Sequence, residues 1–271
     1  MKGEALWDIK TVRESWQKPF QELAFTEKKQ RILPSEYQAD HLRRFQNVLI
    51  VKDQLLGATE LANIQKASEY MNKTRGWSVK FKRDEHSDLF LRQTVGKRTQ
   101  KITEEEVVLI EESMQQVVNL VWSELFSFLM TEPENIHYVN TWINNGPLPA
   151  QSGRYHFTHY DCDEYLEFSK GLFRFPAYAA VFYIDISPEV EGGVTWFPEI
   201  KQGVIPKTNR LAIFDASLAH AVLPATAPKK AARTVMVMNV WDYQTRDEQV
   251  ELTNGILGYT ENRREELQWI P

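Results

Sequence analysis

After about residue 135 the chain breaks into short runs of β-branched and aromatic residues, each separated from the next by Gly, Pro or polar residues. The runs are IHYVNTWIN, YAAVFYIDI, GVTWF, GVIP, RLAIFD, HAVLP and RTVMVMNVW. Strands of this length at this spacing are typical of an antiparallel sandwich or barrel. Residues 135–242 are therefore predicted to form a β jelly roll.

Two segments ahead of the predicted barrel repeat apolar residues at the spacing of a helix. One is ATELANIQKASEYM, residues 58–71, and the other begins near Thr103. Thr103 and Glu106 have the spacing of a capping box, in which each side chain accepts a hydrogen bond from the other residue's backbone N–H. The apolar stripe of this longer helix consists of Val107, Ile110, Met114, Val117, Val121 and Leu125. One side of the helix is therefore expected to be buried.

The remainder of the first half carries weaker signals. NVLIVKD, residues 47–53, is a short β-branched run and predicts a strand. KFKRDEHSD, residues 80–88, is predicted to be a charged loop or a strand edge. Residues 1–46 are expected to be helical or irregular and to pack against the later core through scattered aromatic side chains.

A single α+β domain over residues 1–271 is the simplest arrangement of these elements. Residues 1–134 would form a mainly helical N-terminal part, residues 135–242 the jelly-roll core and residues 243–271 a C-terminal arm. The expected fold is a double-stranded β-helix, a cupin-like jelly roll, with the N-terminal helices packed on one face.

Charge and cysteine content exclude several classes of partner. The net charge of −5 and pI near 5.8 give no broad attraction to nucleic acid or to anionic membranes. One cysteine forms no internal disulfide, and MKGEALWDIKTVRESW has no apolar run of the kind found in signal peptides. We therefore expect a cytoplasmic protein with no nucleic-acid or membrane partner; nothing in the sequence specifies an oligomeric state.

The stretch RYHFTHYDCDEYLEF, residues 154–168, concentrates side chains that can bind a metal. A His-x-Asp pattern occurs in it at His159 and Asp161, and again at His86 and Asp88. The second copy lies in a charge run and is interpreted as a solvated surface. In a strand, residues 159 and 161 point to the same side, so an imidazole and a carboxylate can supply adjacent ligands to one divalent metal.

His220 is the candidate for a third ligand, since it follows the apolar strand RLAIFD and a turn of small residues. Two histidines and one carboxylate on a common face form the facial triad of non-haem Fe(II) oxygenases. Arg233 opens the next predicted strand, thirteen residues later. A buried arginine at that place suits a two-pronged grip on a small dicarboxylate.

From about residue 135 to 242 the sequence resembles the Fe(II)/2-oxoglutarate-dependent dioxygenases, most closely the prolyl-4-hydroxylase-like branch. The matching segments, in the family's order, are HYD at 159–161, AVFYIDISPEVEGGVTWFPE, GVIPKTNRLAIFDASLAHAVLPA and ARTVMVMNVW. GGVTWF is similar to the family's glycine-glycine-acid-threonine-phenylalanine turn, with Val194 where an acid is usual. Before about residue 135 the likeness is confined to the general layout.

The resemblance implies that His159, Asp161 and His220 hold Fe(II) and are the catalytic centre. It further implies that 2-oxoglutarate and O2 are co-substrates, that succinate and CO2 are released, and that ascorbate acts as an activator. The presence of Asp161 favours hydroxylation or desaturation of a C–H bond, because related halogenases have a small residue at that place.

The resemblance also assigns the co-substrate site. Arg233 would bind the distal carboxylate of 2-oxoglutarate, assisted by Thr195 and Tyr183 on strands that face the barrel interior. Each of these also has a structural interpretation, as an ion pair for the arginine and as satisfied core hydroxyls for the other two. Lys207 and Arg210 are the next candidates for the clamp.

Four residues are candidates for contact with the substrate. His156 precedes the first proposed ligand by three residues, and Asp163 begins an acidic loop that could be solvated or could face a cationic substrate. Asn239 and Trp241 lie two apart on the last predicted strand. If these two face the same cavity as the acidic loop, the substrate is small and polar.

The leading prediction is an Fe(II)- and 2-oxoglutarate-dependent oxygenase that hydroxylates an unactivated C–H bond of a small molecule, such as an amino acid or a natural-product intermediate. A hydroxylase of protein or peptide side chains is the alternative within the family. Outside the family, the same scaffold could serve a cupin-like metal-binding isomerase or a binding module without catalysis. Arg233 and the GGVTWF turn distinguish these, because a cupin has no need of a 2-oxoglutarate clamp.

Overall fold

The computed structural model describes residues 6–8, 49–71, 78–83, 90–95, 103–129, 138–144, 156–159, 161, 175–216, 218–223, 225–226 and 231–241. For the strands at 6–8, 90–95 and 156–159, and for residues 78, 83, 125–129 and 226, it describes the backbone alone. His86, Asp88 and Asp163 lie outside the described residues.

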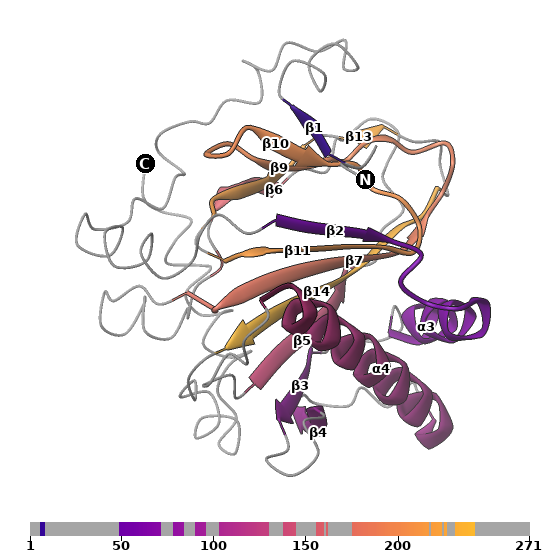
Figure 1. Cartoon of the computed structure of the whole chain (residues 1–271). Helices are drawn as coiled ribbons and strands as arrows, with labels where there is room; N and C mark the ends of the chain where they lie inside the picture. The colour runs from indigo at the N-terminus through magenta and orange to yellow at the C-terminus, as the bar shows by residue number, and fades with distance from the viewer. Residues whose placement is uncertain are drawn as a thin grey trace, which may run out of the picture.

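Two antiparallel sheets face each other in the described part of the chain (Figure 1). The larger has seven strands in the order β2-β11-β7-β14-β5-β3-β4. These are β2 (Leu49–Asp53), β11 (Arg210–Asp215), β7 (Tyr178–Ile186), β14 (Arg233–Trp241), β5 (Tyr138–Asn144), β3 (Ser78–Arg83) and β4 (Phe90–Val95). Every pairing within it is antiparallel.

The smaller sheet has five strands in the order β1-β10-β9-β12-β6. These are β1 (Leu6–Asp8), β10 (Gln202–Val204), β9 (Thr195–Phe197), β12 (His220–Val222) and β6 (His156–His159). A further pair, β8 (Glu191–Gly192) and β13 (Ala225–Thr226), forms a two-stranded ribbon. Antiparallel sheets with few helices fit a jelly-roll-like fold.

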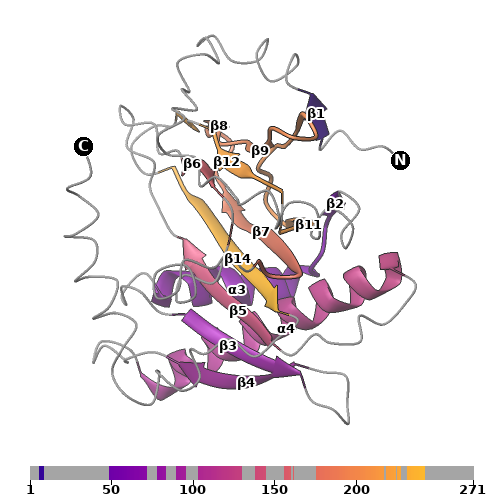
Figure 2. The same ribbon diagram turned by 90° about the vertical axis from the view of Figure 1, so that its left-hand side faces the viewer.

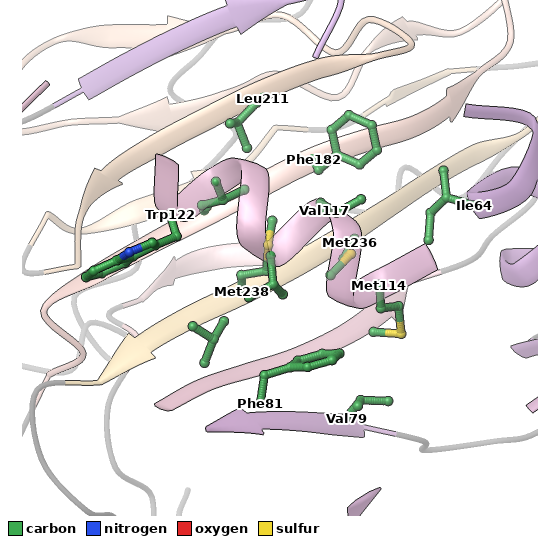
Figure 3. Packing of buried hydrophobic residues seen from close by; sticks show 14 of the residues in the cluster. Ile64, Val79, Phe81, Met114, Val117, Trp122, Phe182, Leu211, Met236 and Met238 are labelled. Carbon is green, nitrogen blue, oxygen red and sulfur yellow. The ribbon is translucent and has the colours of Figure 1, made fainter. Parts of the chain in front are cut away.

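Two helices, α3 (Ala58–Met71) and α4 (Glu104–Leu129), cover the face of the seven-stranded sheet that is turned away from the smaller sheet (Figures 1 and 2). The buried stripe of α4 packs with alternate residues of the sheet, such as Phe182 and Met236 (Figure 3). The predicted capping box is confirmed, because the Thr103 N–H donates to Glu106 Oε2 at 2.8 Å and the Glu106 N–H donates to Thr103 Oγ1 at 3.2 Å.

A second apolar cluster lies on the opposite face of the same sheet. Along β7, Ala180 and Phe182 belong to the helix-side cluster, whereas Ala179, Val181 and Tyr183 belong to the second one. This second cluster also includes Phe197 and Val204 of the five-stranded sheet and therefore lies between the two sheets. We call this face of the seven-stranded sheet the inner face. Successive side chains of a strand point to opposite faces, so each residue of the sheet lies either on the inner face or on the helix side.

The prediction for residues 80–88 is wrong where the structure describes them. Residues 80–83 belong to β3, which lies between β5 and β4 and is not at an edge. Its alternation of Val79 and Phe81 with Lys80 and Lys82 is a strand pattern that the charges obscured. In the described part of the chain, β1, β2, β3 and β4 all come from the first half, so that half contributes strands to both sheets as well as helices.

Among the described residues, neither helix is both long enough and apolar enough to cross a membrane.

Candidate functional site

His220 stands at the start of β12 with its ring oriented by the backbone just before it. Its Nδ1 lies 3.2 Å from the carbonyl oxygen of Leu218, which can only accept, so Nδ1 carries the proton. In a neutral imidazole the lone pair is then on Nε2, the nitrogen that would bind a metal. Nε2 lies 3.9 Å from Asp161 Oδ2, which is too long for a hydrogen bond.

Two aromatic rings hold the His220 imidazole in this orientation. Phe214, at the end of β11, meets it edge to face with the ring centroids 5.0 Å apart. Phe197 of β9 lies 6.2 Å away and packs against Phe214 at 4.8 Å. Because the two phenylalanines come from different sheets, the ring is fixed between them, and 7% of His220 is exposed.

Asn239 holds Asp161 from the other side. With its amide nitrogen turned toward Asp161, Asn239 donates to Oδ2 at 3.1 Å and to the backbone carbonyl of Met238 at 3.1 Å. The reversed orientation would place the amide oxygen against these two acceptors, so the hydrogen-bond network fixes the assignment. Asn239, predicted as a substrate contact, thus lies against the proposed metal-binding carboxylate.

His159 is opposite His220 in the ladder between β6 and β12. The register shifts before the next pair, Val222 with His156. The structure describes His156 and His159 by their backbone alone, so their side chains lie outside the description. Among the described side chains, Asp161 and His220 are brought together, and no third His, Cys, Asp or Glu joins them.

A second polar group joins the two sheets near the start of β14. Tyr183 Oη and Thr195 Oγ1 are 2.8 Å apart, and both residues are fully buried. Burial raises the pKa of Tyr183, although the charge of Arg233 nearby acts to lower it. The three residues predicted to bind the co-substrate, Tyr183, Thr195 and Arg233, therefore lie close together.

Arg233 is held on one side only. One of its terminal nitrogens, Nη2, donates to the carbonyl of Gly193 at 3.2 Å. Its Nε is buried and has no hydrogen-bond partner among the described residues, and no carboxylate of the described chain pairs with it. Burial lowers the pKa of Arg233, with Tyr183 acting to raise it. Arg233 is partly buried, and its enclosed Nε has no counter-charge among the described residues, so this environment suits a bound anion.

The GGVTWF turn is shaped around that arginine. Gly193 has a φ of +69°, a conformation in which side chains are strained. A Cβ on Gly193 would lie 3.1 Å from Arg233 Nε and 3.3 Å from Ala225 Cβ. Only glycine therefore lets the backbone come close enough for its carbonyl to orient the guanidinium.

Arg210 and Lys207, the other candidates for binding 2-oxoglutarate, both pair with Asp53 instead. Arg210 donates through Nε to Asp53 Oδ1 at 2.6 Å, through Nη2 to Asp53 Oδ2 at 2.9 Å, and through Nη1 to the carbonyl of Ile205 at 2.9 Å. Lys207 pairs with the same carboxylate at 2.9 Å and is more than half exposed. These bonds lower the pKa of Asp53 to about 2, mainly through Arg210. Arg210 thus ties β2 to β11, Lys207 ties β2 to the segment just before β11, and Arg233 is the better candidate for an anion site.

Two residues near His220 were missed from the sequence. Glu199 accepts the Ala219 N–H at 2.8 Å through Oε2 and so holds the turn that enters β12. Phe214 packs on the His220 ring. The position of Glu199 directly after TWFP did not predict this role, because a carboxylate beside a turn is usually solvated.

Trp241, predicted as a substrate contact, is buried at the end of β14, opposite Tyr138 in the ladder.

The donor set fits a divalent metal and a dicarboxylate. With bonds of about 2.0–2.2 Å, one divalent ion can reach two ligand atoms separated by 3.9 Å, but only at an angle wider than the roughly 90° between ligands of a facial triad, so the two side chains would move closer together when a metal binds. Thr195 pairs with Val222, two residues from His220, which is about 7 Å along the strand. The Tyr183–Thr195–Arg233 group therefore lies within reach of a small molecule bound at the histidine.

Several solved structures are similar to this chain. A viral collagen prolyl hydroxylase from Paramecium bursaria Chlorella virus-1, described as a 2OG complex, is 15% identical, with a TM-score of 0.41 over 72% of this chain and 96% of that one. IDO from Bacillus thuringiensis is 9% identical, with a TM-score of 0.48 over 79% and 98%. A Pseudomonas putida prolyl-4-hydroxylase is 14% identical, with a TM-score of 0.44 over 76% and 97%.

No protein-family model and no curated protein matches the sequence. At TM-scores below 0.5 the structural likenesses carry no weight of their own. The functional proposal therefore depends on the residues of this chain.

Proposed function

We propose that this protein is an Fe(II)- and 2-oxoglutarate-dependent oxygenase built on a double-stranded β-helix, and that it hydroxylates an unactivated C–H bond of a small molecule. His159, Asp161 and His220 would hold the iron. Bound together, iron and 2-oxoglutarate supply the oxidising chemistry, in which O2 is reduced and succinate and CO2 are released.

The observation that carries this proposal is the environment of Arg233. The Nε of Arg233 is buried without a hydrogen-bond partner in the described chain. Arg233 lies beside the Tyr183–Thr195 pair, on the same strand as Asn239. A metal-binding isomerase or a binding module on the same scaffold has no use for a partly buried cation with an unpartnered Nε at this place. A dicarboxylate gives Arg233 its missing partner and leaves the other end of the ligand toward His220.

The remaining residues position the reactants. His220 is fixed by the Leu218 carbonyl and by Phe214, and Asp161 by the Asn239 amide, so both proposed ligand atoms are oriented before a metal arrives. Burial of these groups excludes bulk water from the place where the substrate would react.

Succinate formation tests the proposal without knowledge of the substrate. Pure protein with Fe(II), ascorbate and 2-oxoglutarate should release succinate slowly in air and none under anaerobic conditions. His159→Ala, Asp161→Ala and His220→Ala should each abolish the release while the free energy of unfolding stays close to wild type. His86→Ala is the matched control and should behave as wild type. Normal turnover by any one of the three variants would remove that residue from the ligand set.

A further inference from the structure

Part of the inner face of the seven-stranded sheet is accessible at β5 and the middle of β14, which lie side by side (Figure 2). Asn140 and Trp142 of β5 and Val237 of β14 are each half-buried. Val237 is directly opposite Trp142, and Asn140 is two residues before Trp142, so all three point to the same face. The residues on either side of Val237, Met236 and Met238, pack on the helix side and are fully buried. Asn140, Trp142 and Val237 therefore form a partly exposed surface on the inner face, which we call the β5 patch.

The β5 patch adjoins both parts of the proposed active site. Asn140 is directly opposite Asn239, whose amide donates to Asp161. Directly opposed side chains of neighbouring strands have Cβ atoms about 5 Å apart. Along β14, Val237 lies between Asn239 and Arg233, the residue proposed to bind 2-oxoglutarate. A molecule on the β5 patch would therefore lie beside both the iron site and the co-substrate.

Asn140 carries an acceptor that the described chain leaves without a donor. Its Oδ1 is buried and has no hydrogen-bond partner among the described residues. Asn239, one neighbour of Asn140 in the sheet, directs its amide nitrogen to Asp161 instead. Lys80, the other neighbour, has its ammonium 4.7 Å from the centroid of the Tyr138 ring. A buried acceptor without a donor is costly, and a carboxamide oxygen only accepts, so this position suits an N–H or O–H group of a ligand.

We propose that Asn140 recognises the substrate through its Oδ1, and that the substrate is an apolar molecule carrying an N–H or O–H donor within a few bonds of the carbon that is oxidised. Trp142 and Val237 pack against the apolar part of this molecule. All three side chains of the β5 patch are neutral, so they bind by one hydrogen bond and by apolar contact. This inference rests on the proposed oxygenase function and names the substrate class of that site.

The two kinds of contact together orient the substrate. The hydrogen bond to Asn140 fixes the donor group about 5 Å from Asn239, next to the carboxylate that would hold the iron. Contact with Trp142 fixes the direction in which the apolar part extends. A molecule held at two points presents one C–H bond to the iron in preference to others. Asn140 is thus a substrate-binding residue that takes no part in bond breaking.

The acceptor without a donor can be tested on the free protein. Asn140→Leu removes the carboxamide and keeps most of its volume. Because Oδ1 loses no partner, the variant should unfold in urea at the same midpoint as wild type or at a higher one. Thr141→Val is the control on the same strand and should have a lower midpoint, since Thr141 Oγ1 donates to the Val79 carbonyl at 3.0 Å. A midpoint lowered in Asn140→Leu as much as in Thr141→Val would show that Asn140 has a structural partner and would overturn the proposal.

Pairs of small aromatic compounds test the substrate class. Indole, phenol and benzamide each carry a donor, and 1-methylindole, anisole and N,N-dimethylbenzamide are the corresponding compounds without it. Protein loaded with Mn(II) and 2-oxoglutarate is titrated with each compound, and relaxation of the compound's protons by the metal reports both binding and closeness to the metal. In at least one pair, the compound with the donor should bind about 2- to 12-fold more tightly, as expected for one neutral hydrogen bond.

Two asparagine variants of β5 assign this preference to a residue. Asn140→Leu should bind both members of the pair without preference and should bind 2-oxoglutarate like wild type. Asn144→Leu, at an exposed residue of the same strand and face, should keep the wild-type preference. The proposal fails if no compound with a donor binds near the metal more tightly than its partner, or if Asn140→Leu keeps the preference. Either result in protein that binds Mn(II) and 2-oxoglutarate leaves the oxygenase function standing, whereas failure to bind 2-oxoglutarate removes that function.

Discussion

Replacement of Arg233 by methionine separates an anion site from a structural ion pair. Methionine keeps much of the arginine's volume and removes its charge and donors. In the proposed complex the distal carboxylate of 2-oxoglutarate would lose charged hydrogen bonds in an enclosed place, at a cost of about 2 to 4 kcal/mol. Calorimetry should therefore show 2-oxoglutarate binding about 30- to 1000-fold more weakly, with Fe(II) affinity almost unchanged.

The stability of the free protein gives this prediction a second readout. Arg233 has no carboxylate partner in the described chain, so Arg233→Met should leave the free energy of unfolding unchanged or raise it. At 100 times its dissociation constant, 2-oxoglutarate should stabilise wild type by about 2.7 kcal/mol and the variant much less.

Arg210→Met is the matched control for the stability measurement. It breaks the two-pronged bond to Asp53 and should lower the free energy of unfolding by about 1 to 3 kcal/mol. The Asp53 side chain is 38% exposed, which keeps this value below that of a fully buried pair. The clamp assignment is refuted if Arg233→Met destabilises the free protein as Arg210→Met does and binds 2-oxoglutarate like wild type.

Three further substitutions test separate parts of the structure. Asn239→Leu removes the amide that orients Asp161 and should weaken Co(II) or Fe(II) binding about 10- to 100-fold by equilibrium titration; unchanged affinity would show that the amide does not position the carboxylate. Thr103→Ala removes one half of the capping box and should lower the free energy of unfolding by about 1 kcal/mol in urea, whereas no loss would mean that the cap is not stabilising. Asp53 has its pKa lowered from 3.8 to about 2, so its contribution is present above about pH 4 and is lost as the pH falls toward 2. Because Asp53 is partly exposed, its contribution to the free energy of unfolding is about 1 kcal/mol. Asp53→Asn should remove this loss of stability between about pH 4 and 2. A variant that loses as much stability in acid as wild type would contradict the ion-pair assignment.

The strands and helices with clear periodicity could be predicted from the sequence. The helix at 58–71 and the capped helix beginning after Thr103 are found where their apolar spacing places them, and the predicted short strands form β5, β7, β9, β10, β11, β12 and β14. Strand β3 was obscured because Lys80 and Lys82 alternate with its apolar residues Val79 and Phe81.

The site could be predicted only as a set of residue types. Asp161 and His220 are brought together as expected, but the partner of Asn239 depends on a ladder register that no local pattern contains. In the same way, Arg210 and Arg233 both open strands, and only the structure shows that Asp53, distant in sequence, pairs with Arg210, whereas Arg233 Nε has no hydrogen-bond partner among the described residues.

The central claim is that one site binds iron and 2-oxoglutarate together. Anaerobic titration of the Fe(II) protein with 2-oxoglutarate, followed by visible absorption, tests it most directly. We expect a metal-to-ligand charge-transfer band that saturates at one 2-oxoglutarate per chain and that is absent from His220→Ala. Wild-type protein that binds both iron and 2-oxoglutarate without developing the band would contradict the claim.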